Sequence, residues 1–469
     1  MALFIFAGAA IPGGELDPFG MFAIEAAAAT ADVGTPQNVK AKATGTSVVL
    51  TWDKVDGADA YRVYKYDSSS KKYVKVKNVS GAKATVKNLS GGTQKFKVAA
   101  LVKTNGKYAA GKASSAVNVK ITASKTAIDV ANEMGNGWNL GNTMEATAPT
   151  WKENPTVTDC ETAWQRYVTT KASIDGIKDA GFGSVRVPVA WSNLMSDDGK
   201  YTISNDYFDR IDEIVGYVLD NDMYCIINIH WDGGWWKDFG AKSESTQKEA
   251  MKKYTAMWTQ IADHYKDYSD KLIFESANEE LGDDGFKLLG VKKMYEKVNE
   301  INQKFVDIVR ASGGKNGERF LLIAGVNTNI QKTCDQKFKM PTDKIDNHLL
   351  ISVHYYDPST YCIATDPNNS WGYQASWGTK DDIAEMEASL SQMKKFSDAG
   401  YGVVIGEYGV GTIKKGNRYV AKEGTDKFFK SMLEICDKYG FCPMLWDIGD
   451  WYNRMECKFK DKKIAAIYK

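Results

Sequence analysis

The feature that most constrains this chain is a series of eight short apolar runs rich in β-branched residues. The runs lie at 138–143, 183–189, 224–230, 272–279, 320–326, 349–356, 403–409 and 443–448. Most segments between them repeat apolar residues three and four positions apart, as amphipathic helices do. Buried strands that alternate with helices predict an α/β fold, a closed parallel (β/α)8 TIM barrel. An open doubly wound sheet is the structural alternative, but no GxGxxG turn follows the first run.

Residues 33–122 show a different periodicity. Apolar residues alternate with polar ones, as at Val48, Leu50 and Trp52, and clusters of Gly, Asn and Ser separate the short segments. About seven strands at this spacing predict an all-β antiparallel sandwich ahead of the barrel. The stretches "LTWDKVDGADAYRVYKYD" and "VKTNGKYAAGKAS" resemble a fibronectin type III domain, in which Trp52 would be the buried core residue. The segment has no His or Cys, so we expect a spacer, with carbohydrate binding as the alternative.

The first 32 residues have the character of a leader segment. They are largely apolar and carry a run of small residues at 26–29, as before an export cleavage site, although no Lys or Arg precedes Lys40. We therefore expect a secreted protein whose catalytic domain spans 123–469. No later segment has the roughly 18 consecutive apolar residues that a membrane span needs, so we expect no membrane association.

Charge and cysteine usage exclude other classes of protein. The chain has 60 Lys and Arg against 59 Asp and Glu, so its net charge creates no positive potential that would hold nucleic acid or an anionic membrane. A local basic patch is still compatible with this balance. Seven Cys occur without a CxxC pair, which argues against a structural zinc site.

Chemically capable side chains occur near the end of one predicted barrel strand after another. In a parallel barrel these ends meet at the face that carries active sites. Any one such residue is commonly a solvated rim group, but so many at one register indicate an active site. The residues are Arg186, His230, Asn278, Glu279, His354, Tyr356, Glu407 and Trp446.

Glu279 and Glu407 suit glycosidic-bond hydrolysis, which needs two carboxyl groups beside the scissile bond, one protonated and one ionised. We expect a retaining separation of about 5–5.5 Å rather than the roughly 6.5–9.5 Å of inverting enzymes. Arg186 should keep Glu407 ionised, whereas burial should raise the pKa of Glu279. We also expect Tyr356 to donate a hydrogen bond to Glu407, and Asn278 to hold the sugar 2-hydroxyl.

Together these eight residues resemble the motif set of glycoside hydrolase family 5, and the resemblance covers roughly 127–459. "GNGWNLGNTMEA", "ETAW", "GIKDAGFGSVRVPVAW" and "VHYYDP" narrow it to subfamily 4, whose members are mostly bacterial endo-β-1,4-glucanases. The resemblance implies retention, Glu279 as acid/base, Glu407 as nucleophile and Trp446 as the sugar-stacking floor. It implies no cofactor and no metal. The expected partner is a polysaccharide, and we expect a monomer.

Three positions depart from the family pattern. Trp231 stands where a second His is common and offers a further aromatic platform for the substrate. Glu280 replaces the usual Pro, and we expect it to point to solvent. Ile448 replaces the usual Asn.

Other carboxylates and aromatic residues have supporting roles in this pattern. Glu275 should lie deeper in the barrel, paired with a cation or a polar layer, whereas Glu145 and Asp232 are expected as loop carboxylates that either line the cleft or face solvent. About two of five loop tryptophans should contact substrate; these five are Trp151, Trp235, Trp236, Trp371 and Trp377.

The sequence leaves other functions possible. A preference for xyloglucan, mixed-linkage glucan or mannan depends on loop shape, which the sequence does not show. A non-catalytic carbohydrate-binding protein would not need both glutamates. A metal-dependent hydrolase using His230 and His354 lacks a third His nearby in sequence.

Overall fold

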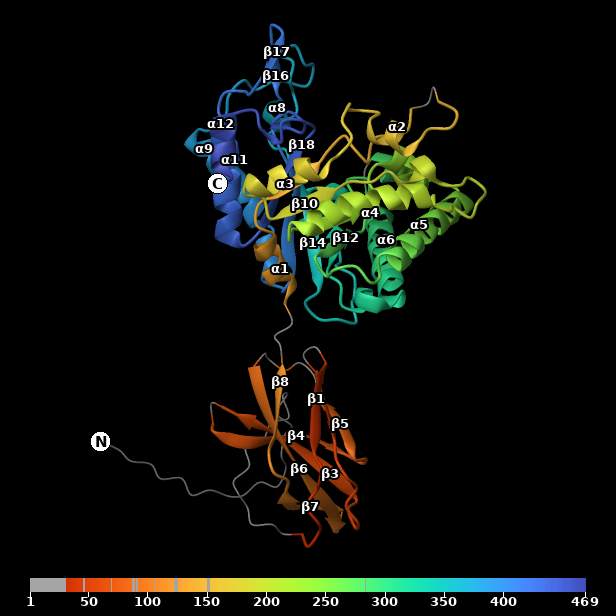
Figure 1. The fold of residues 1–469 in the computed structure, drawn as a ribbon, viewed down its shortest axis with the longest axis vertical. Helices are drawn as coiled ribbons and strands as arrows, with labels where there is room; N and C mark the ends of the chain where they lie inside the picture. The colour runs from red at the N-terminus through yellow and green to blue at the C-terminus, as the bar shows by residue number, and fades with distance from the viewer. Residues whose placement is uncertain are drawn as a thin grey trace, which may run out of the picture. The chain divides into compact units, whose positions relative to one another are not determined.

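The computed structural model describes residues 31–469, apart from 45–46, 69, 87–88, 90–91, 105, 122–124, 150–151 and 283. Nearly all of the expected leader, and Trp151, therefore lie outside the described residues. The chain divides into two compact units, Met1–Lys125 and Thr126–Lys469 (Figure 1).

The first unit contains two antiparallel sheets. The three-stranded sheet has the order β1-β2-β5, and the five-stranded sheet has the order β4-β3-β6-β7 with β8 also paired to β6. The strands are β1 (Lys40–Thr44), β2 (Ser47–Thr51), β3 (Ala60–Asp67), β4 (Lys72–Val79), β5 (Lys83–Val86), β6 (Gly92–Thr104), β7 (Lys107–Ala113) and β8 (Val117–Ile121). Leu50, Val63 and Phe96, from strands of both sheets, share one buried cluster. Trp52 lies in this cluster, as expected, and packs edge-on against Tyr61.

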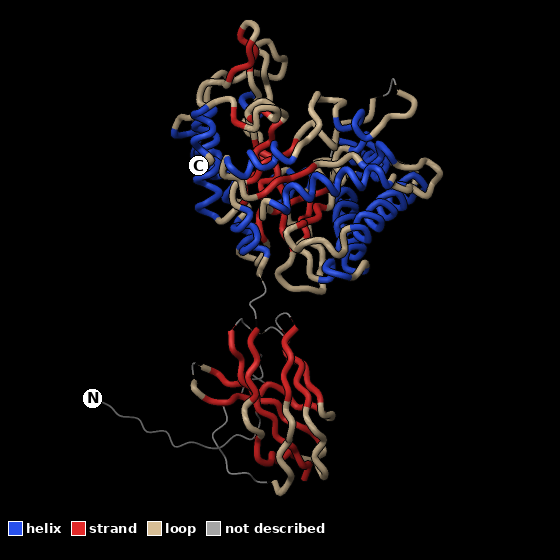
Figure 2. Tube along the Cα trace, in the orientation of Figure 1, coloured by secondary structure: helices blue, strands red, loops and turns tan. Residues whose placement is uncertain are grey.

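The second unit is the predicted barrel. Its eight strands close in the order β10-β11-β12-β13-β14-β15-β18-β9, every neighbouring pair is parallel, and helices surround them (Figure 2). The strands are β9 (Gly137–Leu140), β10 (Ser184–Val187), β11 (Tyr224–Asn228), β12 (Leu272–Glu275), β13 (Leu321–Ala324), β14 (Leu349–Tyr355), β15 (Gly402–Tyr408) and β18 (Cys442–Asp447). Each of the eight apolar runs supplies one of them.

Capping residues mark where several of the helices begin and end. Four of them, α1, α2, α3 and α9, start at a Thr that forms a capping box, and α11 ends at Gly440 in the left-handed conformation. The α-helices are α1 (Ala127–Met134), α2 (Val157–Glu161), α3 (Lys171–Asp179), α4 (Asn205–Asp220), α5 (Glu244–His264), α6 (Val291–Ala311), α7 (Ile330–Cys334), α8 (Ser359–Cys362), α9 (Lys380–Ser391), α10 (Lys394–Ser397), α11 (Thr425–Tyr439) and α12 (Lys462–Ile467).

Short elements complete the loops. The 3-10 turns are η1 (Trp191–Leu194), η2 (Asp232–Gly240), η3 (Asp284–Leu289), η4 (Gly314–Gly317) and η5 (Val326–Thr328). Two small hairpins pair β16 (Ile413–Lys415) with β17 (Arg418–Val420), and β19 (Tyr452–Asn453) with β20 (Lys458–Phe459). Among the described residues, no helix is both long and apolar enough to cross a membrane.

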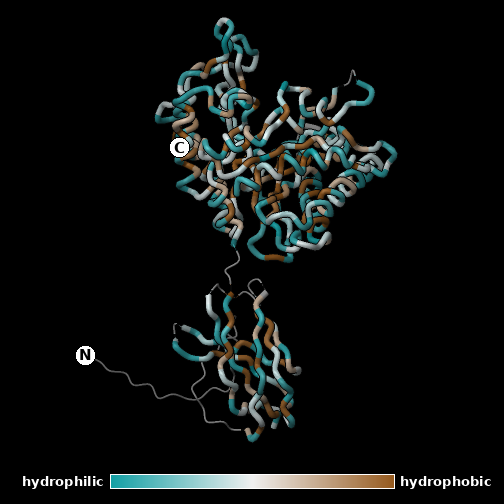
Figure 3. The backbone as a smooth tube through the Cα atoms, in the orientation of Figure 1, coloured by the Kyte–Doolittle hydropathy of each residue, from teal (hydrophilic) through white to brown (hydrophobic). Residues whose placement is uncertain are grey.

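The barrel interior is layered. Helix α1 packs Val130 and Met134 into a buried apolar cluster with inward-facing strand residues such as Ile226, Leu322 and Val404, and so closes one end. Hydrophobic segments run through the middle of this unit, and hydrophilic ones lie at its periphery (Figure 3). The other end of the interior is polar, because Arg186 and Glu275 lie there fully buried. The apolar end stabilises the barrel, and the polar end is free to carry chemistry.

Candidate active site

The predicted site residues come from several strands and from the loops that follow them. Arg186 lies in β10, His354 in β14, Glu407 in β15 and Trp446 in β18. The strand expected over 272–279 ends at Glu275, so Asn278 and Glu279 lie in the loop after β12 rather than at its last residues. His230 likewise follows the end of β11 by two residues.

Arg186 is the centre of a buried hydrogen-bond network. Its Nε donates to Glu275 at 2.7 Å, its Nη1 to Glu407 at 2.8 Å and its Nη2 to the Asn278 side-chain oxygen at 2.8 Å. Glu275 is thus paired with a cation inside the barrel, as expected. Two carboxylates share one guanidinium, which fixes the geometry of the whole group.

Glu407 is held from two sides. Arg186 donates to Oε1, and the Tyr356 hydroxyl donates to Oε2 at 3.0 Å. The Glu407 residue is only 5% exposed, so both contacts act with little competition from water. The predicted Tyr356 hydrogen bond is therefore present in the structure.

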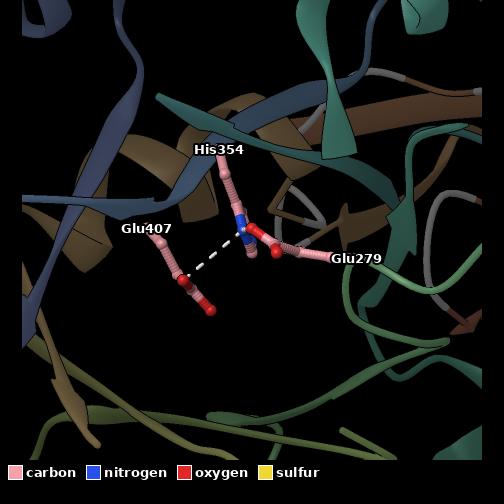
Figure 4. A group of neighbouring side chains, drawn as sticks. All are labelled: Glu279, His354 and Glu407. Atoms are coloured by element: carbon pink, nitrogen blue, oxygen red, sulfur yellow. Dashed lines mark hydrogen bonds and ion pairs between the residues drawn. The ribbon is translucent and has the colours of Figure 1, made fainter. Parts of the chain in front are cut away.

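Glu279, His354 and Glu407 meet across the cleft (Figure 4). His354 Nδ1 lies 2.7 Å from Glu279 Oε1 and 3.6 Å from Glu407 Oε2. One carboxylate oxygen of each glutamate lies within 4.8 Å of the other. An approach of at most 4.8 Å between the nearer oxygens is compatible with the carboxyl groups of retaining glycosidases, which lie roughly 5–5.5 Å apart.

The pKa values of the two glutamates differ from those expected. Burial raises the pKa of Glu279, but the hydrogen bond and charge of His354, with Arg186, outweigh it and leave that pKa below its usual value. Burial raises the pKa of Glu407 above its usual value against the opposing charges of His354 and Arg186. The expected raised pKa of Glu279 is wrong, because the prediction did not place His354 against it.

Irregular backbone positions these groups. The register between β14 and β15 shifts at Val353/His354, and that between β15 and β18 shifts between Ile405 and Tyr408. A Cβ on Gly406 would lie 2.6 Å from Ser352 Oγ and 3.1 Å from His354 Nε2, so only glycine allows this approach. Such bulges redirect side chains beside active sites.

His230 faces the cleft as a neutral donor. Burial, with the charges of Arg186 and His354, holds its pKa well below the usual value. The Asn228 amide nitrogen lies 3.3 Å from His230 Nδ1, which leaves the proton on Nε2. The imidazole also lies parallel to the Trp446 ring, with centroids 6.0 Å apart.

A cavity of about 510 Å³ connects these residues. Its lining includes Glu279, Glu407, His230, Asn278, Tyr356 and Trp446. Trp231 and Trp164, respectively 44% and 47% exposed, line it as well, with ring centroids 6.4 Å apart. Two nearly half-exposed indoles in one cleft form a surface on which sugar rings can stack.

The loop aromatics were predicted poorly. Trp236 and Trp377 are buried, Trp235 stacks on Trp236, and none of these three lines the cavity. Trp371 is exposed but also lies outside the cavity lining. Trp164 and Trp451 line it instead. Trp164 belongs to the "ETAW" motif, so its position in the loop after the first strand was the available signal.

Glu280 does not point to solvent as expected. It lines the cavity, is only 6% exposed, and accepts a hydrogen bond of 3.2 Å from the Asn278 amide nitrogen. Burial, with the nearby charges of Glu279 and Glu407, raises the pKa of Glu280 to about 8. Its carboxyl group is therefore largely neutral at pH 7.

The two loop carboxylates have different surroundings. Glu145 lines the cavity, accepts hydrogen bonds from the backbone of Asn142 and Thr143, and burial raises its pKa to about 7. Asp232 is buried against Ser192 and Trp235 outside the cavity lining and supports the loop.

Glu279, His354 and Glu407 are also the one group of three potential metal ligands found among the described residues. His230 does not belong to this group, so the expected use of His230 and His354 together as ligands of one metal ion has no support from it.

Comparisons with known proteins agree with this geometry. The sequence profile of Cellulase (glycosyl hydrolase family 5) matches residues 144–451. Endoglucanase B of Clostridium cellulovorans is 35% identical over 350 residues, which cover 71% of this chain and 72% of that protein. The xyloglucan-specific endo-β-1,4-glucanase of Bacteroides ovatus is 33% identical over 338 residues, 69% of this chain. The match spans 65% of the length of the Bacteroides protein, just under two thirds.

Solved structures that resemble this chain are also glycoside hydrolases of family 5. A GH5-4 broad specificity endoglucanase from Ruminococcus champanellensis with bound cellotriose has a TM-score of 0.64 and 32% identity, covering 73% of this chain and 98% of that one. A Bacteroides ovatus GH5 xyloglucanase in complex with a XXXG heptasaccharide has a TM-score of 0.65 and 26% identity, covering 90% and 94%. The chain is therefore a glycosidase and belongs to glycosyl hydrolase family 5, the cellulase family.

Proposed function

We propose that this chain is a retaining endo-β-1,4-glucanase that cuts internal bonds of cellulose-type glucans. Glu407 attacks the anomeric carbon, while Glu279 protonates the departing oxygen and later activates water. The observation that carries this proposal is the approach of the two carboxylates to within 4.8 Å across His354. A covalent glycosyl-enzyme intermediate requires this short separation, because no water has to fit between nucleophile and sugar.

The different surroundings of the two glutamates support these roles. Arg186 and Tyr356 donate hydrogen bonds to Glu407, which aim the carboxylate and favour its ionised form against the burial that raises its pKa, as a nucleophile requires. The Glu279 side chain is 45% exposed and contacts His354. A bound glucan would cover that exposed surface, and the lost hydration would raise the pKa of Glu279 toward the protonated form an acid needs.

The remaining polar groups suit the sugar beside the scissile bond. Arg186 holds the Asn278 oxygen and Glu280 accepts one hydrogen of the Asn278 amide nitrogen, so the second hydrogen of that nitrogen can be donated to a 2-hydroxyl. His230 offers its Nε2 proton to a second hydroxyl, and Trp446 provides a face for the ring.

The roles can be tested with the variants Glu279→Ala and Glu407→Ala, an activated aryl cellobioside and added azide. Azide should attack the intermediate of Glu279→Ala and give a β-glycosyl azide. In Glu407→Ala it should occupy the space of the nucleophile and give the α-product. The exposed Glu296→Ala serves as the matched control and should behave as wild type. The opposite pairing of variants and anomers would refute the assigned roles.

Xyloglucan is a second candidate substrate. The similarity to the two Bacteroides ovatus proteins and the exposed indoles of Trp164 and Trp231 favour it, because branched chains need a wide cleft. Reducing-sugar release from carboxymethyl-cellulose, xyloglucan, mixed-linkage β-glucan and mannan would rank the substrates. Release of reducing sugar from mannan alone would leave the proposed mechanism unchanged and would identify the enzyme as a mannanase. Binding without release, by a folded protein, would favour a non-catalytic carbohydrate-binding protein.

We also propose a fibronectin type III-like module at 33–122 joined to a catalytic module at 123–469. Two antiparallel sheets around one core support the first module. The likeness to the Bacteroides ovatus structure covers 90% of the chain, more than the barrel unit alone contains. Because a long glucan cannot enter a cell, the proposed substrate places the enzyme outside it. Deleting residues 1–126 should leave a barrel that unfolds cooperatively and retains its activity.

A further inference from the structure

The two units carry opposite net charges, which the balance of the whole chain conceals. Residues 31–125 contain 18 Lys and Arg against 5 Asp and Glu, a net charge of +13, and three acidic residues before them leave the whole first unit at +10. Residues 126–469 contain 42 against 51, a net charge of −9. A charge this far from zero on a small module creates a positive potential around it and attracts anionic partners.

Much of this charge lies on one face of the five-stranded sheet. Tyr61, Val63, Phe96 and Val98 point into the core, so the alternate positions on the same strands point outward. Val76, Val117 and Val119 of β4 and β8 also pack against the core. The outward residues, called here the lysine–tyrosine face, are Arg62, Tyr66, Tyr73, Lys75, Lys95, Lys97 and Lys120, whereas Tyr64, paired with Lys75 and Lys97, is buried. The five strands contain one acidic residue, Asp67 at the last position of β3, which accepts hydrogen bonds from Ser70.

The lysines and tyrosines of this face pack on one another. Lys97 Nζ lies 4.6 Å from the centre of the Tyr73 ring, and Lys95 Nζ lies 5.5 Å from that of Tyr66. The two rings meet edge-on at 5.3 Å. Rings below the lysine stems restrict where the ammonium groups can lie, so the charges are presented as an ordered array rather than as freely moving side chains.

We propose that the lysine–tyrosine face binds an acidic polysaccharide, a glycan whose sugar rings carry carboxylates. The choice of a glycan rests on the proposed function, since the barrel acts on polysaccharide. The ammonium groups would pair with the carboxylates, and the edges of the tyrosine rings would contact the apolar faces of the sugars.

The acidic polymer would be an anchor and not a substrate. The barrel cavity is lined by the carboxylates of Glu279, Glu407 and Asp450, and the unit around it carries a net charge of −9. Such a cleft disfavours a polymer that carries a carboxylate on every ring more than it disfavours a neutral or sparsely charged glucan. The basic module would therefore hold the enzyme on an acidic component of a mixed polymer while the barrel cuts a neutral one.

Co-sedimentation of the full chain with cross-linked polygalacturonate tests the proposal, with the methyl-esterified polymer as the uncharged control. The face variant replaces Lys75, Lys95, Lys97 and Lys120 with Gln. The matched variant replaces Lys248, Lys292, Lys394 and Lys430, four barrel lysines with exposed side chains, and so removes the same charge from the other unit.

We expect wild type and the matched variant to bind polygalacturonate at low salt, to release it as salt rises, and to ignore the ester. The face variant should bind at least about tenfold more weakly, because four charge contacts are lost. Equal weakening of both variants would overturn the proposal, since net charge alone would then explain binding. Binding to anionic vesicles or duplex DNA without binding to polygalacturonate would overturn the choice of partner.

The activity on soluble neutral glucan separates this proposal from the proposed function. The face variant should hydrolyse it at the wild-type rate, because the substituted lysines lie on another module. A chain that binds polygalacturonate through this face yet cleaves no glucan would support the anchor and refute the catalytic proposal. A face variant that loses glucan hydrolysis while staying folded would overturn the assignment of this face as an anchor.

Discussion

The amide nitrogen of Asn278 donates to the carboxyl group of Glu280 at 3.2 Å. Arg186 holds the oxygen of the same amide, so Asn278 is fixed at both ends. Glu280 Oε2 has no hydrogen-bond partner, and a buried unpaired carboxylate oxygen is costly. The neutral form avoids most of that cost. The third carboxyl group of the cleft therefore positions Asn278 without adding a full negative charge beside Glu279 and Glu407.

This arrangement predicts a pH dependence of stability. The pKa of Glu280 is about 8 in the folded protein, above the ordinary value of 4.5 expected when unfolded. Between these values the folded state holds a proton that the unfolded state has released. Glu280 therefore stabilises the fold most below pH 4.5, and this contribution is lost as pH rises to 8. The loss should be at most a few kcal/mol, at about 1.4 kcal/mol per pKa unit.

The comparison of wild type with Glu280→Gln checks this prediction. Denaturant unfolding at several pH values from 5 to 9 should show wild type losing stability relative to the variant, because Gln cannot ionise. Glu296→Gln, on an exposed face of α6, should follow wild type. Parallel stability curves for wild type and Glu280→Gln would mean that Glu280 is already ionised at pH 5.

Tyr356→Phe should lower turnover and leave the fold intact. The variant removes the hydroxyl that donates to Glu407 Oε2 and keeps the ring. A hydrogen bond to a charged group contributes about 1.5–3 kcal/mol, so kcat/KM should fall roughly 10- to 100-fold. Stopped-flow measurement with an aryl cellobioside would place the loss in the glycosylation step. An unchanged kcat/KM would show that Arg186 alone holds the nucleophile.

Arg186→Met should destabilise the barrel strongly. It leaves the buried carboxylates of Glu275 and Glu407 without their shared cation, and breaking a buried pair in this way costs about 3–5 kcal/mol. Lys171→Met removes an exposed pair with Asp175 and should change the free energy of unfolding little, because water screens such a pair. Urea unfolding of both variants checks the contrast, and similar small losses would show that the network contributes little.

The barrel and the catalytic side chains could be predicted because their signals are local and repeated. Each apolar run became one strand, and the periodicity places Arg186 and Glu407 inside strands. Glu280 could not be predicted, because its burial depends on an amide fixed by an arginine from another strand. The lowered pKa of Glu279 depends in the same way on His354, 75 residues away. Sequence distance conceals such pairs.

The loop tryptophans also could not be assigned from the sequence. Trp164 and Trp231 come from different loops and meet only in the folded protein, while Trp236 and Trp377 fill the core. All four are Trp in loop-like sequence, and nothing local separates a stacking surface from packing. The positive charge of the first unit, by contrast, follows from the sequence alone when the charged residues are counted separately on each side of the boundary between the two units.

Trp231→Ala should impair the cleavage of polymers more than that of small substrates. Its indole is 44% exposed and lines the cavity beside Trp164, so it can stack on a sugar ring beyond the scissile bond. If a sugar ring gains about as much on an indole as a nucleic-acid base does, roughly 1–3 kcal/mol, KM for xyloglucan or carboxymethyl-cellulose should rise roughly 5- to 100-fold. The kcat for an aryl cellobioside should change little, because the catalytic glutamates are untouched. Trp371→Ala removes an equally exposed indole outside the cavity lining and should leave both substrates unaffected. Equal KM changes in the two variants would assign the effect to general surface adhesion instead of the cleft.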